Sequence, residues 1–159
     1  MKIIISSIKK AKLDLKKINI NNIKAIIISS YNNDIEIIPI ENKLVLNFDD
    51  ITEISSSSFS PLIAKKIHSF IDKLDVKKDK LYICCDSGES RSPAIAACIL
   101  RKNGENENQI WRNYNYHPNI LVYKILCKEF GLHNTNLRLK YKKYINDFAL
   151  KKKIKSSKK

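Results

Sequence analysis

Apolar residues in this chain are concentrated in short continuous runs, separated by stretches in which apolar and charged residues follow one another with helical spacing. Ile3-Ile4-Ile5 and Ile26-Ile27-Ile28 are two such runs. A continuous β-branched run is typical of a strand that is buried on both faces, whereas a strand with one solvated face alternates. The runs predict strands at 1–7, 23–29, 43–48 and 81–84, and an edge segment at 35–40 that contains Pro39.

The stretches between these runs place apolar residues three and four positions apart, which indicates helices packed on one side. Ser60-Pro61 is a typical helix start, and Asn103-Gly104 and Gly131 are typical helix ends. The spacing predicts helices at 8–17, 61–74, 93–102, 107–114, 118–130 and 137–153. In the last helix, one face is expected to dock on the domain; it consists of Leu137, Tyr141, Tyr144, Ile145 and Phe148.

Strands that alternate with helices in this way predict an α/β fold, a single compact domain whose central, mostly parallel sheet of four to five strands is flanked by helices. A chain of 159 residues with 43% hydrophobic residues is long enough for one such domain. We expect this domain to span residues 1–133 and a basic C-terminal helix and tail to span 134–159. In open parallel sheets, ligands bind beyond the carboxyl ends of the strands.

The formal net charge of +14 is unevenly distributed, because residues 138–159 contain ten Lys or Arg and a single acid, Asp147. A basic tail favours weak binding to nucleic acid or to another anionic surface, although a solvated face is the simpler interpretation. The four cysteines have no zinc-binding spacing, and neither a signal peptide nor a transmembrane run is visible. These features predict a reducing, cytoplasmic location, with Cys98 and Cys127 as small core residues.

The stretch from Leu81 to Leu100 carries most of the information about function. It reads as an apolar strand, a polar loop with one glycine, and a helix of small residues. Loop amides and a helix N-terminus together favour a bound anion. Cys85 and Arg91 stand at the two ends of the loop, where the amides, the helix and the guanidinium would all stabilise a thiolate. Arg91 can hold two phosphoryl oxygens, and Ser92 can donate a hydrogen bond to the sulfur.

The run Cys85-Asp-Ser-Gly-Glu-Ser-Arg91-Ser92 resembles the Cys-x5-Arg-Ser/Thr loop of the cysteine-dependent protein tyrosine phosphatases, and specifically of the small dual-specificity group. The resemblance implies hydrolysis of phosphomonoesters, phosphotyrosine in proteins first and phosphoserine or phosphothreonine as well, through a phosphocysteine intermediate. It implies no metal and no cofactor. The loop residues that would bind the phosphate are Asp86, Ser87, Gly88, Glu89, Ser90 and Arg91.

The same resemblance implies a general acid some thirty residues before the cysteine, at the end of the preceding strand. Asp50 is the preferred candidate, because strand alternation leaves it one residue further out than Asp49, which stays an alternative. Both could instead be turn or capping residues. Asn119, in a Pro-Asn turn that resembles the supporting turn of the family, is expected to hydrogen-bond the loop or to cap a helix.

This sequence departs from the family's pattern at two places. Cys84 stands where a histidine usually precedes the nucleophile, and Asp86 and Glu89 place two carboxylates inside the loop. Such a loop should repel a polyphosphorylated substrate and favour a singly phosphorylated group. Two alternative functions remain: an RNA 5′-phosphatase or triphosphatase of the same superfamily, whose basic tail would hold the backbone, and a non-catalytic phosphate-binding module.

Overall fold

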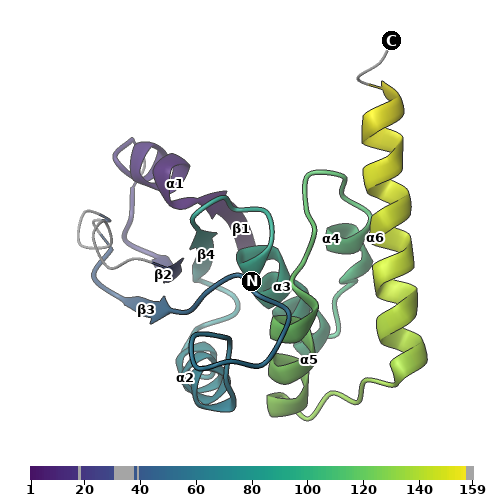
Figure 1. Cartoon of the computed structure of the whole chain (residues 1–159). Helices are drawn as coiled ribbons and strands as arrows, with labels where there is room; N and C mark the ends of the chain where they lie inside the picture. The colour runs from purple at the N-terminus through teal and green to yellow at the C-terminus, as the bar shows by residue number, and fades with distance from the viewer. Residues whose placement is uncertain (18, 31–37, 39, 157–159) are drawn as a thin grey trace.

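The computed structural model describes residues 1–17, 19–30, 38 and 40–156 (Figure 1). Its sheet has four strands, all parallel, in the order β1-β4-β2-β3. The strands are β1 Lys2–Ser7, β2 Ile23–Ser29, β3 Lys43–Asn47 and β4 Lys80–Cys85. The helices are α1 Ile8–Leu15, α2 Pro61–Ile71, α3 Arg91–Lys102, α4 Asn108–Trp111, α5 Ile120–Glu129 and α6 Asn136–Ser156. The predicted α/β fold with a parallel sheet flanked by helices is confirmed.

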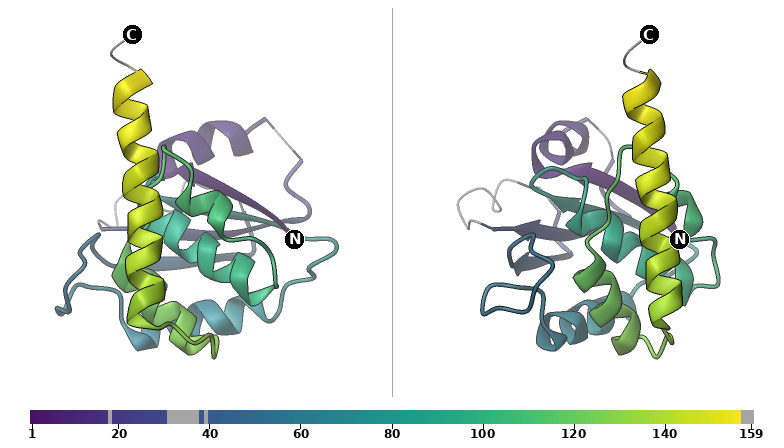
Figure 2. Two further views of the ribbon diagram at one scale, coloured as in Figure 1. Left: turned by 90° about the vertical axis from the view of Figure 1, so that its right-hand side faces the viewer. Right: turned by 45° about the vertical axis from the view of Figure 1, so that its right-hand side comes forward.

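Helices cover the sheet on both faces, which explains why its strands are continuous apolar runs rather than alternating ones. On one face α1 packs against alternate residues of β2 and β4, Cys84 among them. On the other face α2, α3 and α5 enclose the larger part of the core, which includes Cys85. Figures 1 and 2 show α1 on one side of the sheet and α2, α3 and α5 on the other. Adjacent Cys84 and Cys85 therefore point to opposite faces, as strand geometry requires.

Local signals place most helix boundaries where the sequence predicts them. The Ser60 hydroxyl accepts a hydrogen bond from the Ile63 N–H at 3.4 Å and caps α2, whose first residue is Pro61. Helix α4 is shorter than predicted and ends at Trp111. Of the predicted edge segment 35–40, the structure describes only Ile38 and Ile40, both buried, so the strand assignment itself lies outside the described residues.

The docked face of α6 is not the face that the apolar pattern predicts. Leu137, Tyr141, Tyr144 and Phe148 are between 49% and 79% exposed, and only Ile145 of the predicted face is partly buried. The buried positions of α6 are instead Lys142, Asn146 and Ala149. The prediction was wrong because two polar side chains find buried partners on the domain, and a hydrophobic pattern cannot report that.

Glu107, just before α4, is the centre of the contact that holds α6. Its buried carboxylate accepts hydrogen bonds from Lys142 Nζ (2.9 Å), Arg138 Nη2 (2.5 Å), Tyr123 Oη (2.6 Å) and Trp111 Nε1 (3.4 Å). Burial alone would raise the pKa of Glu107, but hydrogen bonds from Tyr123, Lys142 and Arg138 outweigh it and hold the pKa below its ordinary value. Burial also disfavours the charged form of Lys142 and so lowers its pKa, while the hydrogen bond to Glu107 opposes that shift.

Among the helices that the structure describes, none has a stretch of residues long and apolar enough to span a bilayer.

Candidate active site

The loop between β4 and α3 lies at the carboxyl edge of the sheet, where the sequence predicts an anion site. Strand β4 ends at Cys85 and α3 begins at Arg91. Gly88 has φ of +77°, and a Cβ atom built on it would lie 2.5 Å from the backbone N of Ser7 and 2.6 Å from the backbone C of Ser6. Only glycine fits there, because the loop rests directly on the end of β1.

The Cys85 side chain is fully buried at the base of this loop. Its Sγ atom accepts a hydrogen bond from the Gly88 N–H at 3.3 Å and lies 3.1 Å from Ser92 Oγ. Ser92, also fully buried, comes from the first turn of α3. A thiolate at Cys85 would thus have two hydrogen-bond donors already in place, as the sequence predicts for Ser92.

Cys84, which stands where the family carries a histidine, faces away from this site. Its Sγ atom lies 3.8 Å from the Ile26 carbonyl oxygen on the α1 side of the sheet. Burial raises the pKa of the Cys84 thiol to about 12. Cys84 is therefore a neutral core residue, and within the described part of the chain its thiol makes no hydrogen bond to the loop.

Arg91 lies under the loop with its side chain only 5% exposed. Its Nη1 atom donates to Ser30 Oγ at 2.9 Å and to the Phe48 carbonyl at 2.8 Å, which fixes the plane of the guanidinium. Its Nη2 atom donates to Asp86 Oδ2 at 2.5 Å. Its Nε atom is buried and has no hydrogen-bond partner within the part of the chain that the structure describes. A buried N–H donor without a partner is costly, and a ligand oxygen at this position would satisfy it.

The structure brings Asp50, and not Asp49, to this loop. Asp50 Oδ1 accepts hydrogen bonds from Ser90 Oγ and from Asn119 Nδ2, both at 2.8 Å, and Asp50 Oδ2 lies 3.9 Å from Arg91 Nε. The Asp49 backbone N–H donates to the Ser57 carbonyl at 2.8 Å. Within the described part of the chain, no hydrogen bond or ion pair joins the Asp49 carboxylate to these residues.

Asn119 serves both roles that the sequence leaves open for it. Its Oδ1 atom caps α5 by accepting from the Leu121 and Val122 N–H groups at 3.0 and 3.1 Å. Its backbone N–H donates to the Ser90 carbonyl at 3.2 Å, and its Nδ2 atom holds Asp50. Through its side chain and its backbone N–H, Asn119 therefore connects the start of α5, the loop between β4 and α3, and the candidate acid.

Helix α6 supports the segment that carries Asn119. The buried Asn146 Nδ2 donates to the carbonyl oxygens of Trp111 (3.1 Å) and Tyr116 (2.7 Å), and the next residue, His117, donates its N–H to the Glu89 carbonyl at 2.9 Å. The loop is thus held from β1 on one side and, through the segment 111–119, from α6 on the other.

Three contributions to the site do not emerge from the sequence patterns. They are the hydroxyl of Ser30, the carbonyl of Phe48 and the hydroxyl of Ser90, which orient Arg91 or Asp50. Ser30 directly follows β2, so its place beyond the carboxyl end of a parallel strand is the one signal that could have found it. The Asp86 carboxylate, which the sequence predicts inside the loop, is paired with Arg91, and the sequence patterns do not predict this pairing.

No family model and no curated protein sequence matches the chain. Solved structures do match it. The crystal structure of the human tyrosine phosphatase-like serine/threonine/tyrosine-interacting protein aligns with a TM-score of 0.57 at 20% identity, covering 81% of this chain and 91% of that one. The structure of PTPMT1 in complex with PI(5)P aligns with a TM-score of 0.46 at 13% identity, covering 95% and 94%. The four-stranded parallel sheet, its flanking helices and the likeness to the first of these structures together show that the chain has a tyrosine phosphatase-like fold.

Proposed function

We propose that this chain is a phosphatase that hydrolyses phosphomonoesters, phosphotyrosine in proteins above all, through a phosphocysteine on Cys85. The observation that carries the proposal is the arrangement around one point at the sheet edge. Cys85 ends β4 with its Sγ atom 3.1 Å from Ser92 Oγ, Arg91 begins α3, and the Asp50 carboxylate lies 3.9 Å from Arg91 Nε. A thiol nucleophile, a guanidinium and a carboxyl group are the groups that phosphoryl transfer through a cysteine requires.

In the first step the Cys85 thiolate attacks phosphorus and the ester P–O bond breaks. The electron pair goes to the leaving oxygen, which takes a proton from Asp50. Arg91 holds two of the phosphoryl oxygens as charge develops on them. In the second step the Asp50 carboxylate takes a proton from water, whose oxygen attacks phosphorus. The S–P bond breaks, and Ser92 donates a hydrogen bond to the departing thiolate.

A chromogenic aryl phosphate tests this proposal. Wild type should release the phenol, and Cys85→Ser should abolish turnover while it still binds phosphate. Asp50→Asn should lower kcat by about 10²–10⁴-fold, the usual contribution of general acid catalysis. It should also remove the fall in rate toward higher pH that loss of the proton from the general acid causes. Asp49→Asn is the matched control and should keep most of the activity. Phosphate binding without turnover in wild type would instead identify a non-catalytic binding module.

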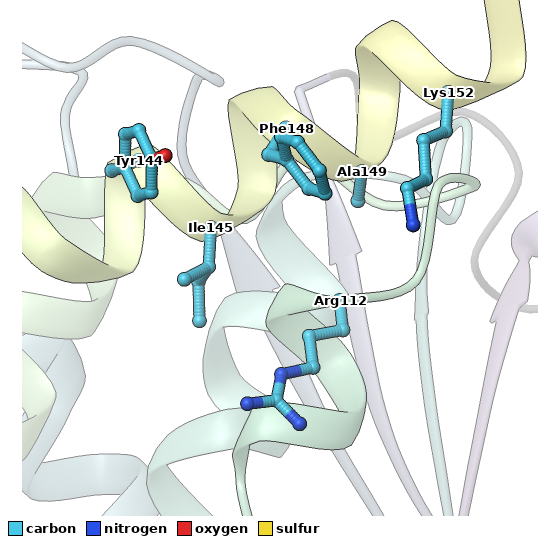
Figure 3. A pocket seen from close by; sticks show the side chains of 6 residues that line it. All are labelled: Arg112, Tyr144, Ile145, Phe148, Ala149 and Lys152. Carbon is cyan, nitrogen blue, oxygen red and sulfur yellow. The ribbon is translucent and has the colours of Figure 1, made fainter.

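One surface feature supports RNA as a second candidate substrate. A groove of about 390 Å³ lies between α6 and the residue that follows α4, and Figure 3 shows Tyr144, Phe148 and Lys152 along the helix and Arg112 on the neighbouring segment. The Tyr144 side chain is largely exposed, while Lys152 Nζ lies 4.9 Å from the centre of the Phe148 ring. Exposed aromatic rings beside cations are typical of surfaces that bind single-stranded nucleic acid.

Salt-dependent binding of a short single-stranded RNA, followed by release of its 5′ phosphate, tests this second candidate. Tyr144→Ser should weaken binding, and Tyr114→Ser, which removes an exposed tyrosine outside the groove, is the control. If both variants bind RNA as wild type does, the groove has no such role.

A further inference from the structure

The Asp86 carboxylate occupies part of the position that a substrate phosphate needs. The Nε and Nη2 atoms of a guanidinium lie on one edge of its plane and form the fork that takes two oxygens of an anion. In Arg91, the Nη2 half of this edge donates to Asp86 Oδ2 at 2.5 Å, whereas the Nε half has no hydrogen-bond partner among the described residues and lies 3.9 Å from Asp50 Oδ2. The remaining nitrogen, Nη1, is used by Ser30 and Phe48 and cannot serve a ligand.

A carboxylate and a phosphoryl group each present two oxygens that this fork can bind, so they compete for Nη2. Asp86 directly follows the nucleophile Cys85, and its side chain is 45% exposed. Among the described residues, its one other hydrogen bond is from the Ser30 N–H at 3.4 Å. A phosphate that enters the loop can therefore displace this side chain without breaking the core.

Once displaced, Asp86 stays beside a phosphoryl group of the same charge sign. The Glu89 carboxylate adds to this repulsion, since Glu89 is an exposed residue within the loop. The mouth of the site is thus locally acidic on a protein whose formal net charge is +14. A cationic group on the substrate, next to the phosphate, would pair with the displaced carboxylate and offset the repulsion.

We propose that Asp86 is a built-in competitor for phosphate at Arg91 and that it selects phosphomonoesters with a cationic group beside the phosphate, such as phosphotyrosine flanked by Lys or Arg. The inference on substrate selection rests on the proposed phosphatase function, whereas competition at Arg91 concerns binding alone. Asp86 is in this sense a residue that determines specificity and takes no part in the bond-breaking steps.

Calorimetric titration with inorganic phosphate tests the competition without any turnover. Asp86→Asn keeps the shape of the side chain and removes its charge, so phosphate should bind about tenfold more tightly, as expected for the loss of one competing charge-assisted hydrogen bond. Glu105→Gln removes the same charge at an exposed position beyond the far end of α3 and should leave phosphate affinity unchanged. Equal or weaker binding in Asp86→Asn would mean that Asp86 positions Arg91 and would overturn the proposal.

Paired phosphotyrosine peptides test the selection. Wild type should have a lower KM for a peptide with Lys on both sides of the phosphotyrosine than for its Glu-flanked counterpart. Asp86→Asn should lose a large part of this preference, and Glu105→Gln should retain it. Equal KM values for the two peptides in wild type would refute the selection. If wild type hydrolyses neither peptide and Asp86→Asn still tightens phosphate binding, the proposed catalysis fails and the competition stands.

Discussion

Replacing Glu107 by Gln should destabilise the protein strongly, because Glu107 joins α6 to the rest of the domain. The substitution keeps the size of the side chain and removes its charge. Lys142, whose side chain is 3% exposed, would then be a buried cation without a counter-charge, held by the neutral Asn108 Oδ1 atom, 2.6 Å away, and at most by the new amide oxygen. Arg138 is 40% exposed and can turn toward water, so most of the cost should arise at Lys142.

Removing one partner of a buried ion pair costs about 3–5 kcal/mol, which is a large share of the stability of one domain. For a domain of this size the loss corresponds to a fall in Tm of about 6–20 °C. Urea unfolding measures it directly. The single tryptophan of the chain, Trp111, donates to Glu107 at 3.4 Å, so its fluorescence reports on this contact. Glu105→Gln, two residues away and exposed, should change the stability by less than about 0.5 kcal/mol.

A double variant separates the charge from the packing. Lys142→Met removes the orphaned cation and keeps an unbranched side chain, so Glu107→Gln combined with Lys142→Met should recover more than half of the stability that the single change loses. The reasoning is refuted if Glu107→Gln costs less than about 1 kcal/mol, or if the double variant is no more stable than the single one.

Three further outcomes follow from the same contacts. Gly88→Ala should abolish phosphate binding and turnover, because the added Cβ overlaps the β1 backbone and the φ of +77° is unfavourable for alanine. Ser92→Ala should slow breakdown of the phosphocysteine by about 10–100-fold, the loss of one hydrogen bond to a charged sulfur, and should produce a burst of phenol in rapid kinetics. Since the folded-state pKa of Glu107 is depressed, its carboxylate stabilises the fold at pH values above the unfolded-state pKa of about 4.3. On acid titration the protein should lose this stabilisation as the pH falls through the folded-state pKa of Glu107. In Glu107→Gln, the free energy of unfolding should depend less on pH in the acid range.

The elements of the sheet and the loop at its edge could be predicted from the sequence because their signals are local. Continuous apolar runs identified the strands, and Cys85, Gly88, Arg91 and Ser92 lie within eight successive positions. Residues that approach from other segments carry no such signal. Ser30 is 61 positions from Arg91, and a lone serine after a strand does not predict which side chain it will contact.

Helix α6 illustrates a second limit. A hydrophobic pattern assumes that apolar side chains are buried, and in α6 the assumption selects the exposed face. The burial of Lys142 and Asn146 depends on acceptors at Glu107, Trp111 and Tyr116, which lie more than twenty-five positions away in the chain. The boundary expected at residue 133 stays a prediction, although side chains on both sides of it are hydrogen-bonded to one another.

The contacts of Asn119 and Asn146 explain why a loop with so little of its own secondary structure can hold a defined shape. Asp50 is placed by Ser90 and by Asn119, and the segment before Asn119 is fixed by Asn146 of α6. Each of these links is a hydrogen bond of 3.1 Å or less between buried or partly buried groups, so none competes freely with water. The candidate acid and the anion loop are therefore oriented by the same chain of amides. A change at α6 that breaks this chain should affect the position of Asp50 before it affects the thiol at the base of the loop, which has its own contacts.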